Sequence, residues 1–145
     1  MDVIVLTANS DNYMYILIDK AANTAAAIDP FDYRKIIKTV ETHKINLTHI
    51  LTTHHHWDHA DGNDGLVSYK PTIIVCGGDN RINSVSQIVE NGTKIKVGSI
   101  VVDCIKTPGH TSNHICYYAT HVQHQDSPCI FTGDTLFIGG CGRLF

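Results

Sequence analysis

The amino-acid sequence predicts a single domain of the mixed α/β (α+β) class. The chain has 145 residues, the size of one ordinary domain and enough to bury a core. Short apolar runs rich in β-branched residues recur along it, and one clearly amphipathic helix follows the first three runs. Strands therefore dominate at first and helices then interleave with them, which is the order expected of a mixed fold.

Strands are expected where short apolar runs lie between turn-forming residues. In addition, the segment KIKVGSIVV places Gly98-Ser99 between two apolar runs, which predicts a hairpin. The expected strands are Val3–Leu6, Tyr13–Ile18, Ala25–Ile28, Thr48–Leu51, Thr72–Val75, Ile100–Ile105, Ile115–Tyr118 and Cys129–Phe131.

Periodicity identifies one helix clearly. Apolar residues at positions 33, 36, 37 and 40 follow the i, i+3, i+4, i+7 spacing, and charged residues occupy the other faces. Asp32 comes just before this run and is a suitable N-cap. A second helix is expected from near Asp58 to Tyr69, and a third from Ile82 to Val89.

Composition and charge exclude several classes of function. Hydrophobic residues make up 43% of the chain and charged residues 17%, as in globular domains. The net charge of −3 and the lack of a basic stretch argue against binding to nucleic acid or to an anionic membrane. The N-terminal segment has neither the basic start nor the apolar core of a signal peptide, and no segment approaches transmembrane length.

The five cysteines indicate a reducing environment. Their number is odd and none of them forms a CxxC pair, so neither a zinc ribbon nor a thioredoxin-like site is expected. Reduced thiols favour a cytoplasmic protein, and a mitochondrial form would need an upstream extension.

The segment LTTHHHWDHADGN carries the most distinctive chemistry. It begins as a strand and ends in a dense group of histidines and aspartates. Because residues two apart in an extended segment point to one side, His54 and His56 are expected to face one point, with His55 turned away. Asp58 and His59 follow where a helix could start, and they can face a neighbouring point. Imidazole suits zinc or iron and carboxylate suits a bridging role, so the cluster predicts two adjacent metals.

Two later segments repeat the order of apolar strand, small residue and metal-binding side chain. His110 follows the run that ends at Ile105, and Asp134 follows the run that ends at Phe131. Loops at strand ends are where a rigid sheet can position a site. Taken singly, His110 fits an ordinary turn and Asp134 an Asx-turn, but the shared order favours metal binding. The remaining histidines lack this placement and are expected to be structural or exposed: His43, His49, His114, His121 and His124.

Several motifs resemble those of the metallo-β-lactamase superfamily and, more narrowly, of the glyoxalase II (hydroxyacylglutathione hydrolase) family. They are THHHWDH, TPGHTSNHICYY and FTGDTLFIGGCGR, supported by DNYMYILID, AIDP, GGDNRI and VGSIVV. The resemblance covers nearly the whole chain. It implies an αβ/βα sandwich with the metals at one edge, followed in the family by a helical substrate domain. It also implies a set of metal ligands: His54, His56 and His110 for the first metal, Asp58 and His59 for the second, and Asp134 between them.

The reaction implied by the resemblance is hydrolysis of S-D-lactoylglutathione to glutathione and D-lactate. Two divalent metals, zinc above all with iron or manganese tolerated, would share a hydroxide that attacks the thioester, because metal binding lowers the pKa of water to about 7. Asp58 would orient that hydroxide. Asp29, in AIDP, either fixes a ligand imidazole from behind or simply forms a turn at a strand end, and the sequence leaves both interpretations open.

The chain also departs from the family pattern. It stops at Phe145, before a further histidine ligand, the rest of the second sheet and the helical domain that the family carries, so residues 1–145 correspond to the N-terminal part of the metal-binding domain. A weak second metal site and an uncovered sheet face that favours self-association are therefore expected. Arg143 and Phe145 are candidate contacts to glutathione, although Phe145 lacks the hydroxyl of the family's tyrosine.

Three functional hypotheses follow. The first is an active glutathione thioesterase. The second is a truncated isoform or fragment that binds metal but has weak activity or none. The third is another member of the superfamily, either a lactonase or a persulfide dioxygenase with one iron; the nearly complete two-metal ligand set and the GGCGR segment disfavour it.

Overall fold

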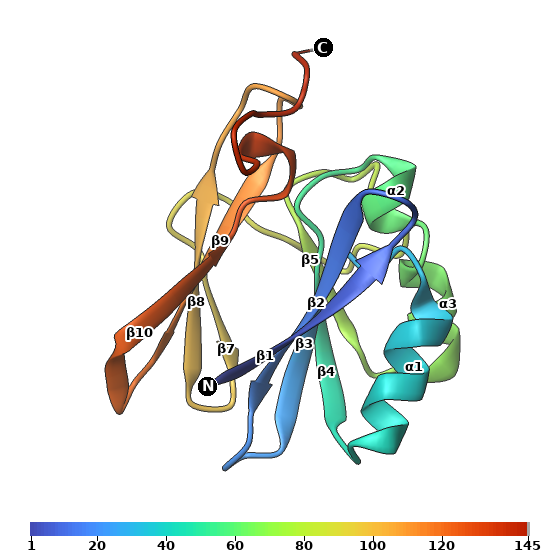
Figure 1. Ribbon diagram of the computed structural model, residues 1–145, viewed down its shortest axis with the longest axis vertical. Helices are drawn as coiled ribbons and strands as arrows, with labels where there is room; N and C mark the ends of the chain where they lie inside the picture. Colours follow the sequence, from blue (N-terminus) through green and yellow to red (C-terminus); the bar gives the residue numbers. More distant parts are fainter. Residues whose placement is uncertain (145) are drawn as a thin grey trace.

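Two β-sheets packed face to face form the body of the protein, with helices on the outer side of one sheet. A computed structural model describes residues 1–144, apart from the side chains of residues 124–126. Figure 1 shows the helices, the first sheet and the second sheet as successive layers. The mixed α/β class is therefore confirmed. The expectations for Phe145 and for the side chain of His124 lie outside the described residues.

The first sheet has six strands in the order β1-β2-β3-β4-β5-β6. Its first three strands are antiparallel, and β3 to β6 run parallel to one another. Parallel strands place their carboxyl ends at one edge of the sheet, so loops from β3, β4 and β5 meet there. The bounds are β1 Asp2–Ala8, β2 Asn12–Asp19, β3 Thr24–Ile28, β4 Asn46–Leu51, β5 Ile74–Gly77 and β6 Gln87–Ile88.

The second sheet is antiparallel, with four strands in the order β10-β9-β8-β7. The predicted hairpin at Gly98-Ser99 is confirmed, because Val97 pairs with Ile100 across the turn. Exposed apolar side chains on the edge strands include Val3, Val5 and Ile130, and self-association through an uncovered sheet face stays a prediction. The bounds are β7 Lys94–Val97, β8 Ile100–Lys106, β9 Ile115–His121 and β10 His124–Phe131.

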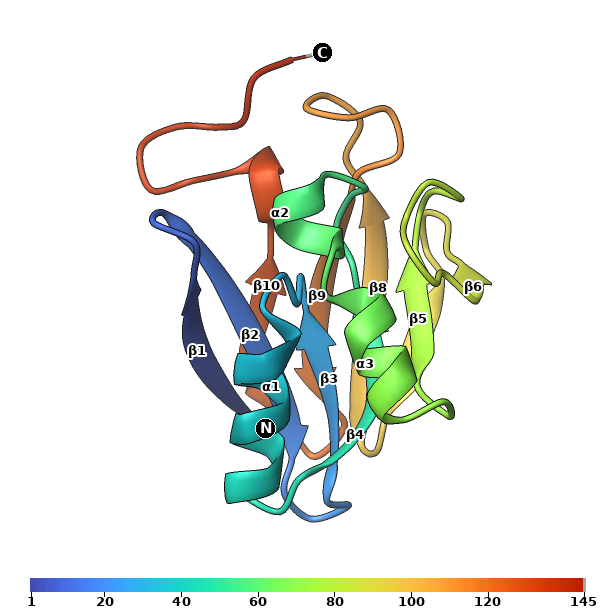
Figure 2. The same cartoon turned by 90° about the vertical axis from the view of Figure 1, so that its right-hand side faces the viewer.

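Helices α1, Tyr33–Thr42, and α3, Asn63–Tyr69, cover the outer face of the first sheet (Figure 2). The prediction for α1 is confirmed down to its cap, because the Asp32 side chain accepts a hydrogen bond from the Lys35 amide. Ile36 and Val40 of this helix are buried against the sheet. None of the helices in the described part of the chain is long and apolar enough to cross a membrane.

The prediction of one helix from Asp58 to Tyr69 is wrong. The segment forms two short helices instead, α2 at Trp57–Ala60 and α3, separated at Gly62. Gly62 lies so close to the Pro30 carbonyl that a Cβ atom would overlap it. This close approach turns the chain and buries Asn63, whose amide donates to Thr52 Oγ1 and the Asn83 carbonyl.

The prediction of a helix from Ile82 to Val89 is also wrong. Ser84 has a positive φ of 56°, which a helix does not allow, and the chain then forms the short strand β6. The Val89 amide donates to the Gly77 carbonyl, so pairing with β5 decides the local structure. The strand expected at Thr72–Val75 begins and ends two residues later, as β5.

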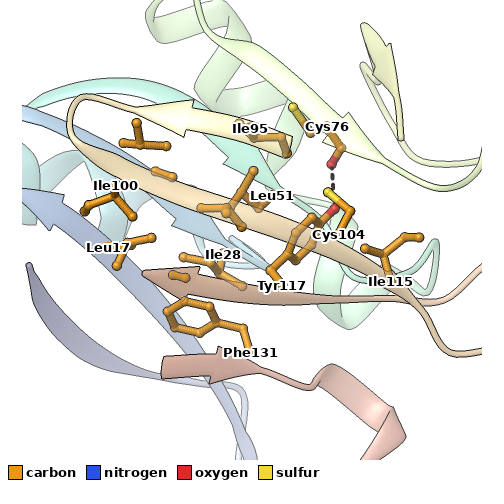
Figure 3. Packing of buried hydrophobic residues seen from close by; sticks show 14 of the residues in the cluster. Leu17, Ile28, Leu51, Cys76, Ile95, Ile100, Cys104, Ile115, Tyr117 and Phe131 are labelled. Atoms are coloured by element: carbon orange, nitrogen blue, oxygen red, sulfur yellow. Dashed lines mark hydrogen bonds between the residues drawn. The ribbon is translucent and has the colours of Figure 1, made fainter. Parts of the chain in front are cut away.

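The main core lies between the two sheets (Figure 3). Leu17, Ile28 and Leu51 from the first sheet meet Ile100 and Tyr117 from the second, and all five are inaccessible to solvent. The Tyr117 hydroxyl donates to the Thr52 carbonyl, directly after β4. A second cluster fills the space between the first sheet and the helices. The end of β4 is therefore held by packing on both faces.

Candidate metal centre

The histidine cluster begins at the buried end of β4. Thr52, Thr53 and His54 follow that strand and are almost inaccessible to solvent. Figure 1 shows that α2 and the C-terminal stretch lie at the same end of the molecule. Because core packing holds β4, the side chains of this loop have little freedom, which suits a metal site.

Asp29 organises the cluster from behind. It directly follows β3 with a positive φ of 47°, and one of its carboxylate oxygens accepts from the Thr53 amide at 2.7 Å. The other oxygen accepts from Thr53 Oγ1 at 2.8 Å and from His59 Nδ1 at 2.9 Å. Asp29 thus both follows the strand in a turn conformation and contacts the imidazole of a candidate ligand, and its role toward a metal stays a prediction.

Three imidazoles converge on one point. His56 Nδ1 lies 3.1 Å from His54 Nε2 and 2.9 Å from His110 Nε2. The rings of His54 and His110 meet edge to face, with centroids 4.8 Å apart. His55 points away, toward the Asp79 carboxylate, as the alternation predicted. The structure thus brings together the three histidines expected to bind the first metal.

Hydrogen bonds behind the rings fix which nitrogen faces the centre. His110 Nδ1 donates to the Arg143 carbonyl at 2.6 Å. His54 Nδ1 lies 3.0 Å from Thr53 Oγ1, whose own proton goes to Asp29, so His54 is the donor there. The Nε2 atoms of His54 and His110 therefore carry lone pairs in the neutral rings. A buried, nitrogen-rich set of this kind fits Zn²⁺, which binds imidazole nitrogen readily.

Asp134 lies between this group and a second one. Its Oδ2 is 3.3 Å from His110 Nε2, and its Oδ1 is 3.1 Å from His59 Nε2. Asp58 joins the second group, with Oδ2 3.6 Å from His59 Nε2. Metal-binding atoms lie within 4.8 Å of one another in two sets that share His54: His54, His56 and His110, and His54, His59 and Asp134.

The electrostatics separate the two groups. Burial and the neighbouring imidazoles hold the pKa of His54 far below its usual range, so this ring stays neutral. Burial also lowers the pKa of His59, but the Asp29 and Asp134 carboxylates outweigh it and raise the pKa to about 10. Burial raises the pKa of Asp134, and the contact with His59 reverses this and lowers it. The first group therefore centres on a neutral imidazole, whereas the second pairs an imidazole with carboxylates that favour positive charge at this point.

Sequence reasoning assigned no role to Asn12, which contacts Asp58. The Asn12 amide donates to Asp58 Oδ2 at 2.7 Å and so fixes one oxygen of that carboxylate. Asn12 belongs to the segment DNYMYILID and begins β2. A polar amide at the first position of an otherwise apolar strand is the feature of the sequence that could have indicated a role for Asn12.

Asp79 and His114 also lie close to the cluster without having been predicted. Asp79 is buried, accepts hydrogen bonds from the Arg81 guanidinium and from Asn113 Nδ2, and faces His55. The Arg81 side chain holds the pKa of Asp79 far below its usual range. His114 was expected to be structural or exposed, and it is fully buried against the His54 ring. In the sequence, the segments Gly77–Asp79 and His110–His114 gave the local hint that these two side chains lie near the cluster.

A cleft of about 450 Å³ opens beside the two groups. Its polar lining includes candidate ligands and the exposed Arg143, and its apolar lining includes Trp57 and Phe137. The expected contact at Phe145 lies outside the described residues. Asp61 is exposed at the end of α2. The lining residues are His56, Trp57, Asp58, His110, Asp134, Phe137, Cys141, Gly142 and Arg143.

Curated relatives align with almost the whole chain. It is 42% identical over 137 residues to a protein of Arabidopsis thaliana named "Hydroxyacylglutathione hydrolase cytoplasmic", covering 93% of this chain and 53% of that protein. It is 40% identical to the "Hydroxyacylglutathione hydrolase" of Dictyostelium discoideum, covering 100% of this chain and 55% of that protein. The chain thus spans about half the length of the curated relatives it matches. No protein-family model matches it.

Solved structures share the fold. The structure of ETHE1 from Myxococcus xanthus is 31% identical with a TM-score of 0.85, and it covers 99% of this chain and 61% of that one. A metallo-β-lactamase from Staphylococcus aureus is 26% identical with a TM-score of 0.83, covering 100% of this chain and 46% of that one.

The fold and the paired histidine and aspartate groups thus define a protein of the metallo-β-lactamase fold, with residues suited to divalent metals. Within that class the chain is similar, over nearly its whole length, to curated proteins named hydroxyacylglutathione hydrolase.

Proposed function

We propose that this chain carries the metal centre of a hydroxyacylglutathione hydrolase, which cleaves the thioester of S-D-lactoylglutathione to give glutathione and D-lactate. The observation that carries the proposal is the convergence of His54, His56 and His110 beside Asp134, at the mouth of a cleft. The names of the relatives supply the substrate class.

Two divalent metals, zinc first with iron or manganese as alternatives, fit the residues present. His54, His56 and His110 would hold the first, Asp58 and His59 the second, and Asp134 would lie between them. When bound, such ions supply Lewis acidity and make hydroxide available near neutral pH. The second position has one imidazole against three in the first, so we expect it to bind more weakly.

Residues around the cleft orient the groups that would hydrolyse a thioester. Asp29 fixes His59 directly and His54 through Thr53, so both rings present Nε2 to the centre. Asp58, held by Asn12 at one oxygen, orients the attacking nucleophile from the side of the cleft. The leaving thiolate has a parent pKa of about 8.5 and needs no dedicated general acid.

Substrate binding is assigned to the outer part of the cleft. Arg143 supplies a cation for a carboxylate of glutathione, while Trp57 and Phe137 supply apolar surface. Trp57 is itself held by an edge-to-face contact with Phe31, whose ring centroid lies 5.4 Å away. The proposed location is the cytoplasm, supported by the name of the Arabidopsis relative and by the five free thiols.

Hydrolysis of S-D-lactoylglutathione by the zinc-loaded protein tests the proposal. His54→Ala and Asp134→Ala are expected to abolish turnover and to lower zinc binding, because each removes a central ligand. His49→Ala is the matched control, since His49 lies on β4 outside the cleft, next to Thr48 Oγ1. A zinc-loaded wild type without thioesterase activity, or a His54→Ala variant with normal turnover, would contradict the proposal.

A further inference from the structure

His114 lies directly behind the candidate metal centre and is not one of the proposed ligands. It precedes β9 and is inaccessible to solvent. Its ring stacks on that of His54, with centroids 5.0 Å apart and an interplanar angle of 22°. The stack places His114 against the one histidine that both sets of candidate metal-binding atoms share.

The Nδ1 atom of His114 joins two segments that carry candidate ligands. It lies 3.1 Å from Thr107 Oγ1 and 3.1 Å from Thr135 Oγ1, and these two oxygens are 2.8 Å apart. Thr107 begins the loop that leads to His110, and Thr135 directly follows Asp134. This triangle of hydrogen bonds therefore ties the backbone beside Asp134 to the loop of His110.

Gly133, the residue before Asp134, packs against the other edge of the His114 ring. Gly133 has a positive φ of 46°, and a Cβ atom there would lie 2.8 Å from His114 Nε2 and 2.5 Å from Thr53 Oγ1. Nε2 itself has no hydrogen-bond partner among the described residues. Only glycine fits between this edge and Thr53, so the chain reaches Asp134 by passing closely around His114.

From these contacts we propose that His114 is a positioning residue that fixes Asp134 relative to His59, and thereby sets the affinity of the second metal position. Asp134 lies in a short 3-10 turn, Gly133–Thr135, and its carbonyl accepts from the Gly142 amide of the exposed C-terminal stretch, whereas His59 is held by the buried Asp29. The contact of His114 with Thr135 adds a buried support for this turn. The inference rests on the proposed two-metal centre, and partners behind the ligands commonly set metal affinity in this way.

Cobalt titration of the metal-free protein, followed by visible absorption, tests the inference without any activity assay. His114→Phe keeps a ring against His54 but loses the contact with Thr135. The affinity for the second Co²⁺ is expected to fall about 10- to 100-fold, while the first changes little. His121→Phe is the matched control, because His121 is a buried histidine at the far end of β9, and it should titrate like the wild type.

Thr135 provides a second route if the histidine variant does not fold. Thr135→Val removes the hydroxyl and keeps the shape, and Thr135→Ser keeps the hydroxyl. The valine variant should lose second-site affinity and the serine variant should retain it. Equal titrations for this pair, or a folded His114→Phe with both affinities unchanged or both equally reduced, would overturn the inference. A wild type that binds no Co²⁺ would instead refute the proposed metal centre itself.

Discussion

The two walls of the cleft differ sharply in how they are held. The inner wall comes from loops that follow buried strands, and the residues directly behind it, His54, His59 and Asp29, are at most 5% exposed. The outer wall comes from the C-terminal stretch, where Phe137 is 46% exposed and Ile138 fully exposed. One wall is continuous with the core, and the other lies on the surface.

This difference separates two tasks of a binding site. Metal ligands need fixed geometry, and the inner wall obtains it from the packing and hydrogen bonds that already hold the sheets together. The outer wall has few buried apolar contacts, so its opening costs less free energy and it can adapt to a ligand. We therefore expect changes to the inner wall to affect stability and metal binding, and changes to the outer wall to affect mainly substrate affinity.

The largest difference is expected for matched aliphatic truncations. Leu51→Ala, at the buried end of β4, should lower the free energy of unfolding by about 2–5 kcal/mol, because it leaves a cavity between the sheets. Ile138→Ala should change it by less than about 0.5 kcal/mol, because that side chain is exposed. Urea denaturation measures both values. Equal losses in the two variants would show that the outer wall is as tightly packed as the inner one.

A smaller effect is expected at Asp29, which contacts the candidate ligand His59 without being a candidate ligand itself. Asp29→Asn places an amide opposite two donors, His59 Nδ1 and Thr53 Oγ1, so zinc affinity should fall about 10- to 100-fold. Competition with a chelator measures this. Asp32→Asn is the control, because asparagine caps a helix as well as aspartate does. Unchanged zinc affinity in Asp29→Asn would remove Asp29 from the organisation of the centre.

The smallest effect is expected on the outer wall. Arg143→Gln should raise KM for S-D-lactoylglutathione about two- to five-fold with little change in kcat, because an exposed ion pair contributes about 0.2–1 kcal/mol. The Arg143 carbonyl, which accepts from His110, is retained in this variant. Initial rates over a range of substrate concentrations measure it. A large fall in kcat would mean that this wall also shapes the metal centre.

Local patterns were enough to predict the inner wall. His54, His56, His110 and Asp134 each follow an apolar strand, and the structure brings them together because these strand ends share one edge. The same local patterns did not predict the roles of Asn12 and His114. Their roles depend on contacts with residues far along the chain, Asp58 and Thr135, which no local spacing reveals.

The errors in the helices have a similar origin. The segment from Ile82 to Val89 has helical spacing, but pairing with β5 draws Gln87 and Ile88 into the sheet. Gly62 interrupts the other predicted helix because the chain packs against Pro30 there. In both places a contact with a distant part of the chain outweighed local propensity. The Asp61-Gly62 pair, a frequent turn signal, could have indicated the second break.

The hairpin at Gly98-Ser99 has a consequence for how the molecule could be altered. Its Ser99 amide donates to the Asp19 carboxylate at 2.6 Å, and the same carboxylate accepts from the amides of Ala21 and Ala22 in the β2–β3 turn. This clasp joins the two sheets at the end opposite α2 (Figure 1). The register of the sandwich is thus anchored away from the reactive end. We therefore expect a change in length of the exposed C-terminal stretch beside the cleft to leave the alignment of the two sheets at this clasp unaffected.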